Sequence, residues 1–309
     1  MARCFVTRHL PGPALGRLRE RHEVDVWPER LPPPYDELRR RTADAEGLLS
    51  LLTDRVDAAL IEGAPQLRAI ANYAVGYDNI DLAAAAARDI QVGNTPDVLT
   101  DATADLTFTL LLAAARCLPD ALLAVQTSDW VTWEPAQYLG HDVHGATLGI
   151  IGMGRIGRAV ARRAAGFDMT VLHTGREGGV PLLTLLARSD FVSLHCPLTP
   201  ATHHLIDAAA LEEMQRTAIL INTARGPIVD QSALIDALRT GQIAGAALDV
   251  TDPEPPPPDD PLLSTPNLIV APHIGSATHT AREAMAALAV DNLLAALEGA
   301  PMPHPVRAE

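Results

Sequence analysis

Short apolar runs alternate with longer helical patterns along the first ninety-odd residues of this chain. Each short run contains Val, Ile or Leu, and most are followed by apolar positions at the spacing of one helix face. Such alternation predicts parallel strands with helices on both faces of a sheet. The predicted strands cover residues 3–8, 24–27, 47–52, 67–73 and 90–94, and the predicted helices cover 12–21, 35–42, 56–62 and 81–88.

The same alternation returns after residue 147, which predicts a second α/β region. Its strands are expected to be largely parallel, because a helical pattern separates most of them. The predicted strands cover residues 148–151, 169–174, 191–195, 218–223, 246–250 and 268–271, and the predicted helices cover 159–164, 181–188, 208–215 and 232–239.

Two further helical patterns link these regions. Residues 101–118 are apolar nearly all round, which predicts one long buried helix. Residues 280–297 are expected to dock back onto the first region. We therefore predict two domains, one of residues 1–97 completed by residues 278–309, and one of residues 98–277. Trp130 and Trp133 fall in a loop-like stretch, which indicates either a contact surface for another subunit or core packing.

Composition narrows the classes of protein to consider. The 309 residues carry a formal net charge of -14 and no basic run, which argues against nucleic acid as a main partner. The three cysteines are scattered and suggest no disulfide framework. No apolar run reaches the length of a membrane span, and the N-terminal residues resemble a first strand and not a signal peptide. We expect a cytoplasmic protein without a membrane partner.

The strongest local motif is the glycine-rich turn of residues 152–157. It has the pattern G-x-G-x-x-G between a predicted strand and a predicted helix, which is the context that a dinucleotide-binding turn requires. Gly152 would make the tight turn, Gly154 would admit a pyrophosphate to the backbone, and Gly157 would let helix and strand pack closely. The helix N-terminus would attract the phosphates. The alternatives are a turn that only packs, or a site for FAD or a methyl donor.

Three ionisable residues follow strand ends in the second region: Arg225, Glu254 and His273. Parallel strands end at one edge, so these side chains are expected to converge near the glycine turn. An arginine there can hold a carboxylate bidentately, and a histidine can exchange a proton with a carbonyl oxygen. A carboxylate beside the histidine would favour its charged imidazolium. Together these residues predict reversible reduction of a 2-keto acid.

Metal binding is not predicted. His203 and His204 are adjacent, and we expect their side chains to point apart without further ligands at a suitable spacing.

Over essentially its whole length, the chain resembles the D-isomer-specific 2-hydroxyacid dehydrogenases. The resemblance rests on the glycine turn and on residues 72–81, 195–200, 222–226, 248–250 with 254–255, and 272–275. It implies that Arg225 binds and polarises the substrate, that His273 is the acid/base and that Glu254 pairs with it. It also implies a Rossmann-type domain inserted into a flavodoxin-like substrate domain, a cleft between the two, and a homodimer.

Residues 95–100, 173–176 and 273–278 and the two tryptophans resemble the glyoxylate/hydroxypyruvate reductase branch of that family. By the same resemblance, Val75 and Gly76 contact the substrate carboxylate through backbone groups, with Leu51 and Leu52 near the rest of the substrate. The positions that match the cofactor site are Thr103, Gly152, Met153, Gly154, Arg155, Ile156, Gly157, Thr174, Gly175, Arg176, Cys196, Pro197, Thr202, Thr223, Ala224, Asp249 and Gly275.

The end of the second strand bears on the choice of nicotinamide cofactor. An acidic residue there binds the ribose 2′-OH of NAD, whereas an arginine accommodates the 2′-phosphate of NADP. Gly175 takes the acidic position and Arg176 follows it, so we expect NADP(H) to be preferred. Glu177 is an alternative acidic residue, which leaves NAD(H) open. Residues 176–182 are short where family members carry a longer helix and an edge strand.

Three functions remain in view. The first is NADPH-dependent reduction of glyoxylate and hydroxypyruvate. The second is reduction of another 2-keto acid, such as 2-ketogluconate or a pyruvate-like substrate, or the same chemistry with NADH. The third is a non-catalytic regulator that senses dinucleotides, which would not need Arg225, Glu254 and His273 together.

Overall fold

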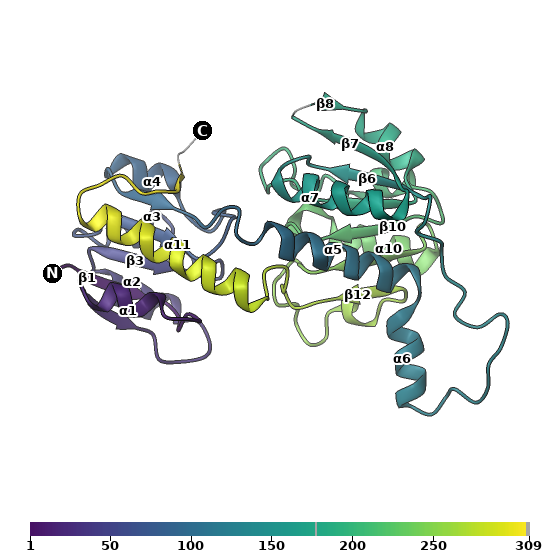
Figure 1. Ribbon diagram of the computed structural model, residues 1–309, viewed down its shortest axis with the longest axis horizontal. Coiled ribbons are helices and arrows are strands. Elements are labelled where there is room, and N and C mark those ends of the chain that lie inside the picture. Colours follow the sequence, from purple (N-terminus) through teal and green to yellow (C-terminus); the bar gives the residue numbers. More distant parts are fainter. Residues whose placement is uncertain (177, 307–309) are drawn as a thin grey trace. The chain divides into compact units, whose positions relative to one another are not determined.

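The computed structural model describes residues 1–176 and 178–306 (Figure 1). Glu177, the alternative acidic residue for the cofactor ribose, lies outside the described residues. The chain divides into two compact units. The first comprises Met1–Leu99 and Ala277–Glu309, and the second comprises Thr100–Ser276.

The first unit is built on a six-stranded sheet in its described residues, with the order β13-β5-β4-β3-β1-β2. The predicted parallel strands are confirmed, and one antiparallel edge strand is added, with Pro305 opposite Gly93. A two-residue strand carries no periodic signal, so the sequence could not predict it. The strands are β1 (Arg3–Val6), β2 (Glu23–Val26), β3 (Gly47–Ser50), β4 (Ala69–Asn72), β5 (Gln91–Gly93) and β13 (Pro305–Val306).

Helices cover both faces of this sheet. Leu38, Leu60 and Ala85 bring three helices into one core with sheet residues such as Ile70. The last long helix, α11, lies against β3, β4 and β5, which confirms that it docks on the first unit (Figure 1). The helices are α1 (Ala14–Arg19), α2 (Tyr35–Thr42), α3 (Ala58–Glu62), α4 (Leu82–Ala87) and α11 (His279–Leu297).

The second unit is built on a seven-stranded sheet in its described residues, with the order β12-β11-β10-β9-β6-β7-β8. Apart from the last pair, the neighbouring strands are parallel. The strands are β6 (Thr147–Ile151), β7 (Thr170–Gly175), β8 (Gly178–Gly179), β9 (Phe191–Leu194), β10 (Ile219–Asn222), β11 (Gly245–Leu248) and β12 (Leu268–Val270).

Helices also pack on both faces of the second sheet. The helices are α5 (Thr100–Ala115), α6 (Leu118–Gln126), α7 (Arg155–Ala164), α8 (Leu182–Arg188), α9 (Ala208–Glu212) and α10 (Gln231–Thr240), with short 3-10 turns at Ala165–Phe167, Gly226–Ile228 and Pro261–Ser264. Asp207 and Asp230 begin α9 and α10 by accepting hydrogen bonds from backbone N–H groups of their first turns. Each sheet thus has the doubly wound α/β architecture that the sequence predicts.

Two predictions about this unit are wrong in detail. The single helix expected over residues 101–118 breaks after Ala115, because Cys117 adopts a left-handed backbone with φ 49°. The chain then bends by 67° into α6. The short segment after β7 does keep an edge strand, since Gly178 and Gly179 pair antiparallel with Gly175 and Thr174.

Among the described residues, no single helix is long and apolar enough to cross a membrane. The bent pair α5 and α6 meets that test of length and composition only when the two helices are taken together.

Candidate active site

The glycine turn has the backbone geometry of a dinucleotide cradle. Gly152 has φ +98°, and a Cβ there would lie 2.6 Å from the backbone N of Cys196. A Cβ on Gly157 would lie 2.2 Å from the Gly152 carbonyl oxygen, so only glycine lets α7 approach β6 this closely. A Cβ on Gly154 would meet no atom within 4 Å, so its backbone faces open space at the start of α7. Such a turn fits a pyrophosphate.

This turn lies where the strand order reverses. β6 is followed in the chain by β7 on one side, whereas β9, β10, β11 and β12 lie on the other side. Ligands of open α/β sheets bind at the carboxyl edge beside such a reversal. Arg225 follows β10, Glu254 follows β11 and His273 follows β12, so the three segments start from neighbouring parallel strands.

His273 and Glu254 are in direct contact. His273 Nδ1 lies 2.5 Å from Glu254 Oε1, and both side chains are partly exposed. The other carboxylate oxygen of Glu254 accepts a longer hydrogen bond of 3.4 Å from the Thr251 N–H. The contact uses Nδ1 of the ring, which leaves Nε2 as the nitrogen that can exchange a proton with a ligand.

Asp249 holds the backbone that carries His273. Its two carboxylate oxygens accept hydrogen bonds of 2.7 Å from the N–H groups of Ile274 and Gly275, and the Asp249 carbonyl accepts one of 2.9 Å from the His273 N–H. His273 has φ 54°, an unfavourable conformation for a residue with a side chain. Burial raises the pKa of Asp249, and the N–H groups of Ile274 and Gly275 oppose that rise. Asp249 therefore also has a structural function beyond the predicted cofactor contact.

Arg225 stands on a turn that Asn222 shapes. The Asn222 side chain donates to the Arg225 carbonyl at 2.8 Å and accepts from the Ala224 N–H at 3.0 Å. A Cβ on Gly226 would lie 1.9 Å from the Thr251 carbonyl oxygen, so the segment after Arg225 touches the loop that leads to Glu254. The structure thus brings the segments of all three predicted residues to one edge of the second unit.

Several predicted cofactor residues lie on the same edge. Thr223 Oγ1 is 3.0 Å from Thr107 Oγ1 on α5, and a Cβ on Gly275 would lie 3.4 Å from Thr103. Thr202 donates to the Pro197 carbonyl at 2.7 Å, which closes the loop after β9. The remaining members follow strand ends of the same sheet: Ala224 after β10, Cys196 after β9, and Thr174, Gly175 and Arg176 at the end of β7.

Cys196 is not a candidate nucleophile. Burial raises the pKa of its thiol to about 11, so the thiol stays protonated near neutral pH and is a poor nucleophile. Cys196 packs against the apolar core of this unit, which accounts for its burial.

Val75 and Gly76 belong to the first unit, on the loop after β4. Asn94 donates to the Val75 carbonyl at 2.7 Å, and Asn72 donates to the Gly76 carbonyl at 2.9 Å. In a trans peptide the N–H points opposite to the C=O of the same unit. The Gly76 N–H is therefore directed away from Asn94, in an orientation fixed by the bond from Asn94 to the Val75 carbonyl.

His203 and His204 differ from expectation. Their rings stack with centroids 4.0 Å apart and do not point away from each other. In the part of the chain that the structure describes, no group of three or more His, Cys, Asp or Glu residues could hold a metal ion.

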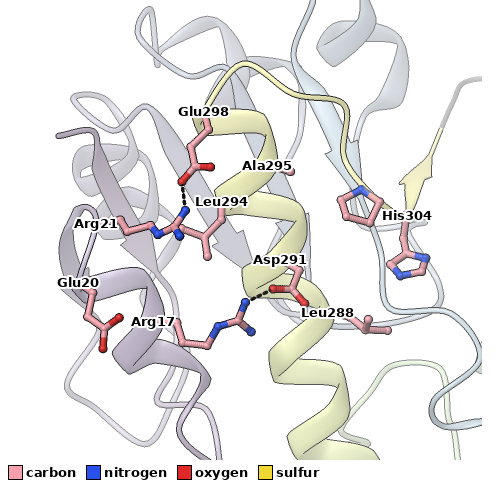
Figure 2. Close-up of a pocket in the computed structure, with 10 residues that line it drawn as sticks. Arg17, Glu20, Arg21, Leu288, Asp291, Leu294, Ala295, Glu298 and His304 are labelled. Atoms are coloured by element: carbon pink, nitrogen blue, oxygen red, sulfur yellow. Dashed lines mark hydrogen bonds and ion pairs between the residues drawn. The ribbon is translucent and has the colours of Figure 1, made fainter.

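A hollow of about 400 Å³ lies in the first unit between α1 and α11 (Figure 2). Its arginines are already paired, because Arg17 contacts Asp291 and Arg21 contacts Glu298. None of the predicted site residues lines it. It is therefore not the candidate active site.

Sequence reasoning did not assign functions to Asn222 or Asn72. Each is completely buried at the end of a parallel strand and shapes the turn that follows. Asparagine as the last residue of a strand is a turn signal, because its side chain can bond backbone groups of the turn, here two to four residues ahead. That signal was present in the sequence before both loops.

The cradle, the strand reversal and the three convergent segments define a nicotinamide-dependent oxidoreductase with a Rossmann-type domain. The profile described as "D-isomer specific 2-hydroxyacid dehydrogenase, NAD binding domain" matches residues 108–275. The chain belongs to this family and is an NAD(P)-dependent enzyme.

Relatives match over nearly the full chain. The glyoxylate reductase of Korarchaeum cryptofilum is 50% identical over 319 aligned residues, covering 99% of this chain and 96% of the relative. A Thermus thermophilus crystal structure has a TM-score of 0.93 and 51% identity, covering 98% of this chain and 99% of that one. The NADPH-dependent glyoxylate/hydroxypyruvate reductase of Sinorhizobium meliloti, solved with NADP and malonate, has a TM-score of 0.86 and 35% identity, covering 99% of this chain and 96% of that one.

Proposed function

We propose that the protein reduces glyoxylate to glycolate and hydroxypyruvate to D-glycerate, with NADPH as the hydride donor. The observation that carries this proposal is the contact of 2.5 Å between His273 Nδ1 and Glu254 Oε1 beside the Arg225 turn and the glycine cradle. The Korarchaeum cryptofilum relative is named a glyoxylate reductase, and the Sinorhizobium meliloti relative is named an NADPH-dependent glyoxylate/hydroxypyruvate reductase, which supports the proposal.

The chemistry follows from the side chains. When bound at the glycine cradle, NADPH would supply the hydride that reduces the carbonyl carbon of the keto acid. Arg225 binds the substrate carboxylate and draws electron density toward the carbonyl oxygen. His273 donates a proton from Nε2 to that oxygen as it becomes an alkoxide, so one hydride and one proton yield the hydroxy acid. Glu254 orients the ring through its contact with Nδ1.

Val75 and Gly76 are proposed as the residues of the first unit that bind the substrate carboxylate. Two observations support this: their carbonyls are held by Asn94 and Asn72, and their loop follows the carboxyl end of a parallel strand. A backbone anion site of this kind is selective for the carboxylate and indifferent to the rest of the substrate.

NADP(H) is proposed as the preferred cofactor. Gly175 has a backbone that favours glycine, with φ +159°, and offers no carboxylate to a ribose 2′-OH. Arg176 follows it at the exposed end of β7 and brings a positive charge suited to a 2′-phosphate. The fingerprint residues 152–157 and the positions after β9, β10, β11 and β12 complete the proposed cofactor site.

A homodimer is proposed as the assembly. α6 and the loop after it project from the sheet of their unit (Figure 1). Leu122, Leu123, Trp130 and Trp133 on this arm are between 54% and 78% exposed. Such a concentration of large apolar side chains is a protein interaction surface, and a second copy of the chain is the occupant consistent with the family.

The second candidate is reduction of a larger or different 2-keto acid with the same residues. The side chains of Leu51 and Leu52 are aliphatic and offer no hydrogen bond that would select one particular substituent on the keto acid. A purely regulatory dinucleotide sensor is disfavoured, because it would have no use for the contact between His273 and Glu254.

The test is a panel of initial rates with glyoxylate, hydroxypyruvate, pyruvate and 2-ketogluconate, each with NADPH and with NADH. We expect the highest kcat/KM for the first two substrates with NADPH. In Arg176→Ala, the KM for NADPH should rise by at least about 10-fold while that for NADH changes little, because one charge-assisted contact is worth about 1.5–3 kcal/mol. No turnover of any keto acid would refute the proposed function.

A further inference from the structure

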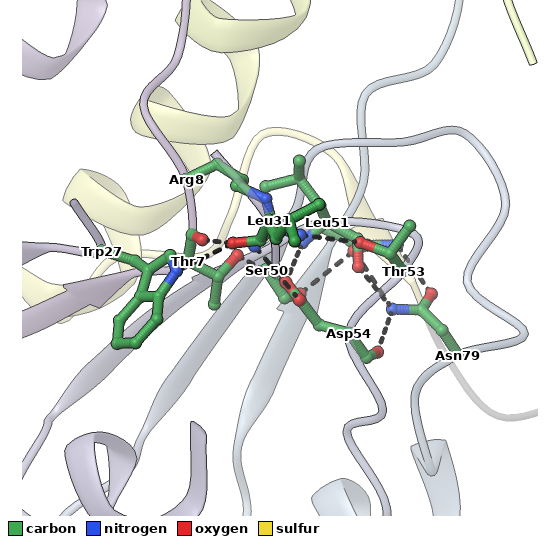
Figure 3. A network of polar contacts seen from close by, with 10 residues as sticks. Thr7, Arg8, Trp27, Leu31, Ser50, Leu51, Thr53, Asp54 and Asn79 are labelled. Carbon is green, nitrogen blue, oxygen red and sulfur yellow. Dashed lines mark hydrogen bonds and ion pairs between the residues drawn. The ribbon is translucent and has the colours of Figure 1, made fainter. Parts of the chain in front are cut away.

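A buried carboxylate in the first unit has no part in the chemistry described above. Asp54 is 2% exposed and ends a short turn after β3, with its N–H donating to the Leu51 carbonyl at 3.0 Å. A buried carboxylate costs free energy unless it is bonded or paired. Its contacts are drawn in Figure 3.

One oxygen of Asp54 closes the turn. Asp54 Oδ2 accepts a hydrogen bond of 2.7 Å from the Leu51 N–H and another from the Thr7 hydroxyl. Thr7 follows β1, and Leu51 follows β3, which is the neighbouring parallel strand. The carboxylate therefore connects two strand ends at one edge of the sheet.

The other oxygen faces a cation. Among the described residues Asp54 Oδ1 has no hydrogen-bond partner, but Arg8 Nη1 lies 3.9 Å away. Arg8 also donates to the Thr7 carbonyl at 2.6 Å and to Thr53 Oγ1 at 3.4 Å. Burial raises the pKa of Asp54, while the Leu51 N–H, the Thr7 hydroxyl and Arg8 oppose that rise. Arg8 thus fixes the second side of the turn.

The same turn is tied to the loop of Val75 and Gly76. Asn79 Nδ2 donates at 3.0 Å to the carbonyls of both Leu51 and Asp54. Asn72 Nδ2 in turn donates to Asn79 Oδ1 at 3.0 Å and to the Gly76 carbonyl at 2.9 Å. A continuous chain of hydrogen bonds therefore runs from Asp54 to the backbone that we propose binds the substrate carboxylate.

We propose that Asp54 is a positioning residue that sets substrate size, by holding the turn of Leu51, Leu52 and Thr53 at a fixed distance from the loop of Val75 and Gly76. This inference rests on the proposed function, since it assigns the two leucines to the substituent of the 2-keto acid. With the turn held, the aliphatic side chains exclude large substituents. Without the Asp54 contacts the turn is free to move, so Leu51 and Leu52 no longer exclude substrates with large substituents.

The decisive variant is Asp54→Ala in the full-length protein. We expect the ratio of kcat/KM for 2-ketogluconate to that for glyoxylate to rise by at least about 5-fold, because a closed pocket discriminates substrates by roughly 10–200-fold and a released turn loses part of that discrimination. The KM for NADPH should stay within about twofold. Asp54→Asn keeps an oxygen for Leu51 and Thr7 and should restore most of the wild-type ratio. Asp44→Ala, on an exposed side chain of the same unit, is the matched control and should leave the ratio unchanged.

If Asp54→Ala does not fold, Thr7→Val removes one donor to the carboxylate with little change in shape and should shift the ratio in the same direction. An equal fall in kcat/KM for both substrates, or an unchanged ratio, would overturn the inference, because a merely structural loss affects every substrate alike.

Hydrogen exchange separates this inference from the proposed function. If the wild-type protein reduces neither keto acid, the proposed function fails, and the positioning of the turn is judged by exchange of the Leu51 amide. We expect that amide to exchange at least about 10-fold faster in Asp54→Ala than in the wild-type protein, because its hydrogen-bond acceptor is gone. Equal exchange rates would overturn the positioning role.

Discussion

The contact between Glu254 and His273 should appear in the rate of the reaction. Glu254 Oε1 lies 2.5 Å from His273 Nδ1 and so orients the ring that we propose protonates the alkoxide. In Glu254→Ala, we therefore expect kcat/KM for glyoxylate reduction to fall by roughly 100-fold, the lower end of what general acid catalysis contributes. Initial rates with glyoxylate, measured beside NADPH binding as a control for folding, check this. A near-wild-type kcat/KM would count against the pairing.

Arg225 should matter more to the reaction than to the fold. Arg225→Ala removes a charge-assisted contact of a few kcal/mol to the substrate, so kcat/KM for glyoxylate should fall by at least about 100-fold. NADPH binding, followed by fluorescence titration, should be nearly unchanged. Arg225→Lys keeps the charge but not the planar fork and should recover only part of the activity. A near-wild-type kcat/KM for the alanine variant would remove Arg225 from the mechanism.

At the residue scale, the sequence predicts which side chains follow which strands but not their contacts. Arg225, Glu254 and His273 can be singled out as candidates because arginine, glutamate and histidine after parallel strands are residue types suited to catalysis. Asp249 was placed near the cofactor only by resemblance, and its bonds to Ile274 and Gly275 depend on a positive φ at His273. Long-range contacts of this kind leave no periodic signal in a sequence.

At the element scale, strands and helices with a clear apolar period were predicted well. The errors fall where the period is too short or is interrupted. β8 and β13 have two residues each, and the apolar pattern continues through Cys117 although its backbone turns left-handed. Apolar periodicity reports which residues are buried, and a sharp bend between two apolar helices does not interrupt it.

The end of β9 makes the stability of the second unit sensitive to acid. His195 Nε2 lies 2.8 Å from Ser193 Oγ, and burial lowers the pKa of His195 to about 3. In the unfolded chain, histidine binds a proton below pH ~6.5. The unfolded state therefore gains protons that the folded state cannot bind, and stability falls as the pH drops from about 6.5 toward 3.

We expect His195→Gln to remove this dependence while keeping an amide to bond Ser193. Between pH 7 and pH 5, the variant should lose less free energy of unfolding than the wild-type protein by about 1–2 kcal/mol, because a tenfold rise in proton activity is worth about 1.4 kcal/mol for a proton that only the unfolded state binds. Urea unfolding at the two pH values measures this. His144→Gln, on an exposed side chain, is the control. Parallel losses in wild type and His195→Gln would contradict the argument.

At the scale of the whole molecule, the arm formed by α6 and the loop after it exposes apolar side chains that contacts within a single chain do not account for. Leu122 and Leu123 on α6 and the two tryptophans beyond it expose large apolar surfaces. Each tryptophan can bury roughly 150–250 Å², so the arm approaches the ~800 Å² per partner of a standard interface. Left in water, this area would be an aggregation hazard, so its presence favours a second copy of the chain as the partner.

Charge placed on this arm should therefore separate the subunits. In the double variant Leu122→Asp with Leu123→Asp, we expect light scattering to give the mass of one chain where the wild-type protein gives that of two. Two buried carboxylates without partners would destabilise the interface by several kcal/mol. Leu183→Asp, at an exposed leucine on α8 of the same unit, should remain dimeric. If wild type and both variants share one mass, the arm is not the dimer interface, and its apolar surface needs a different partner.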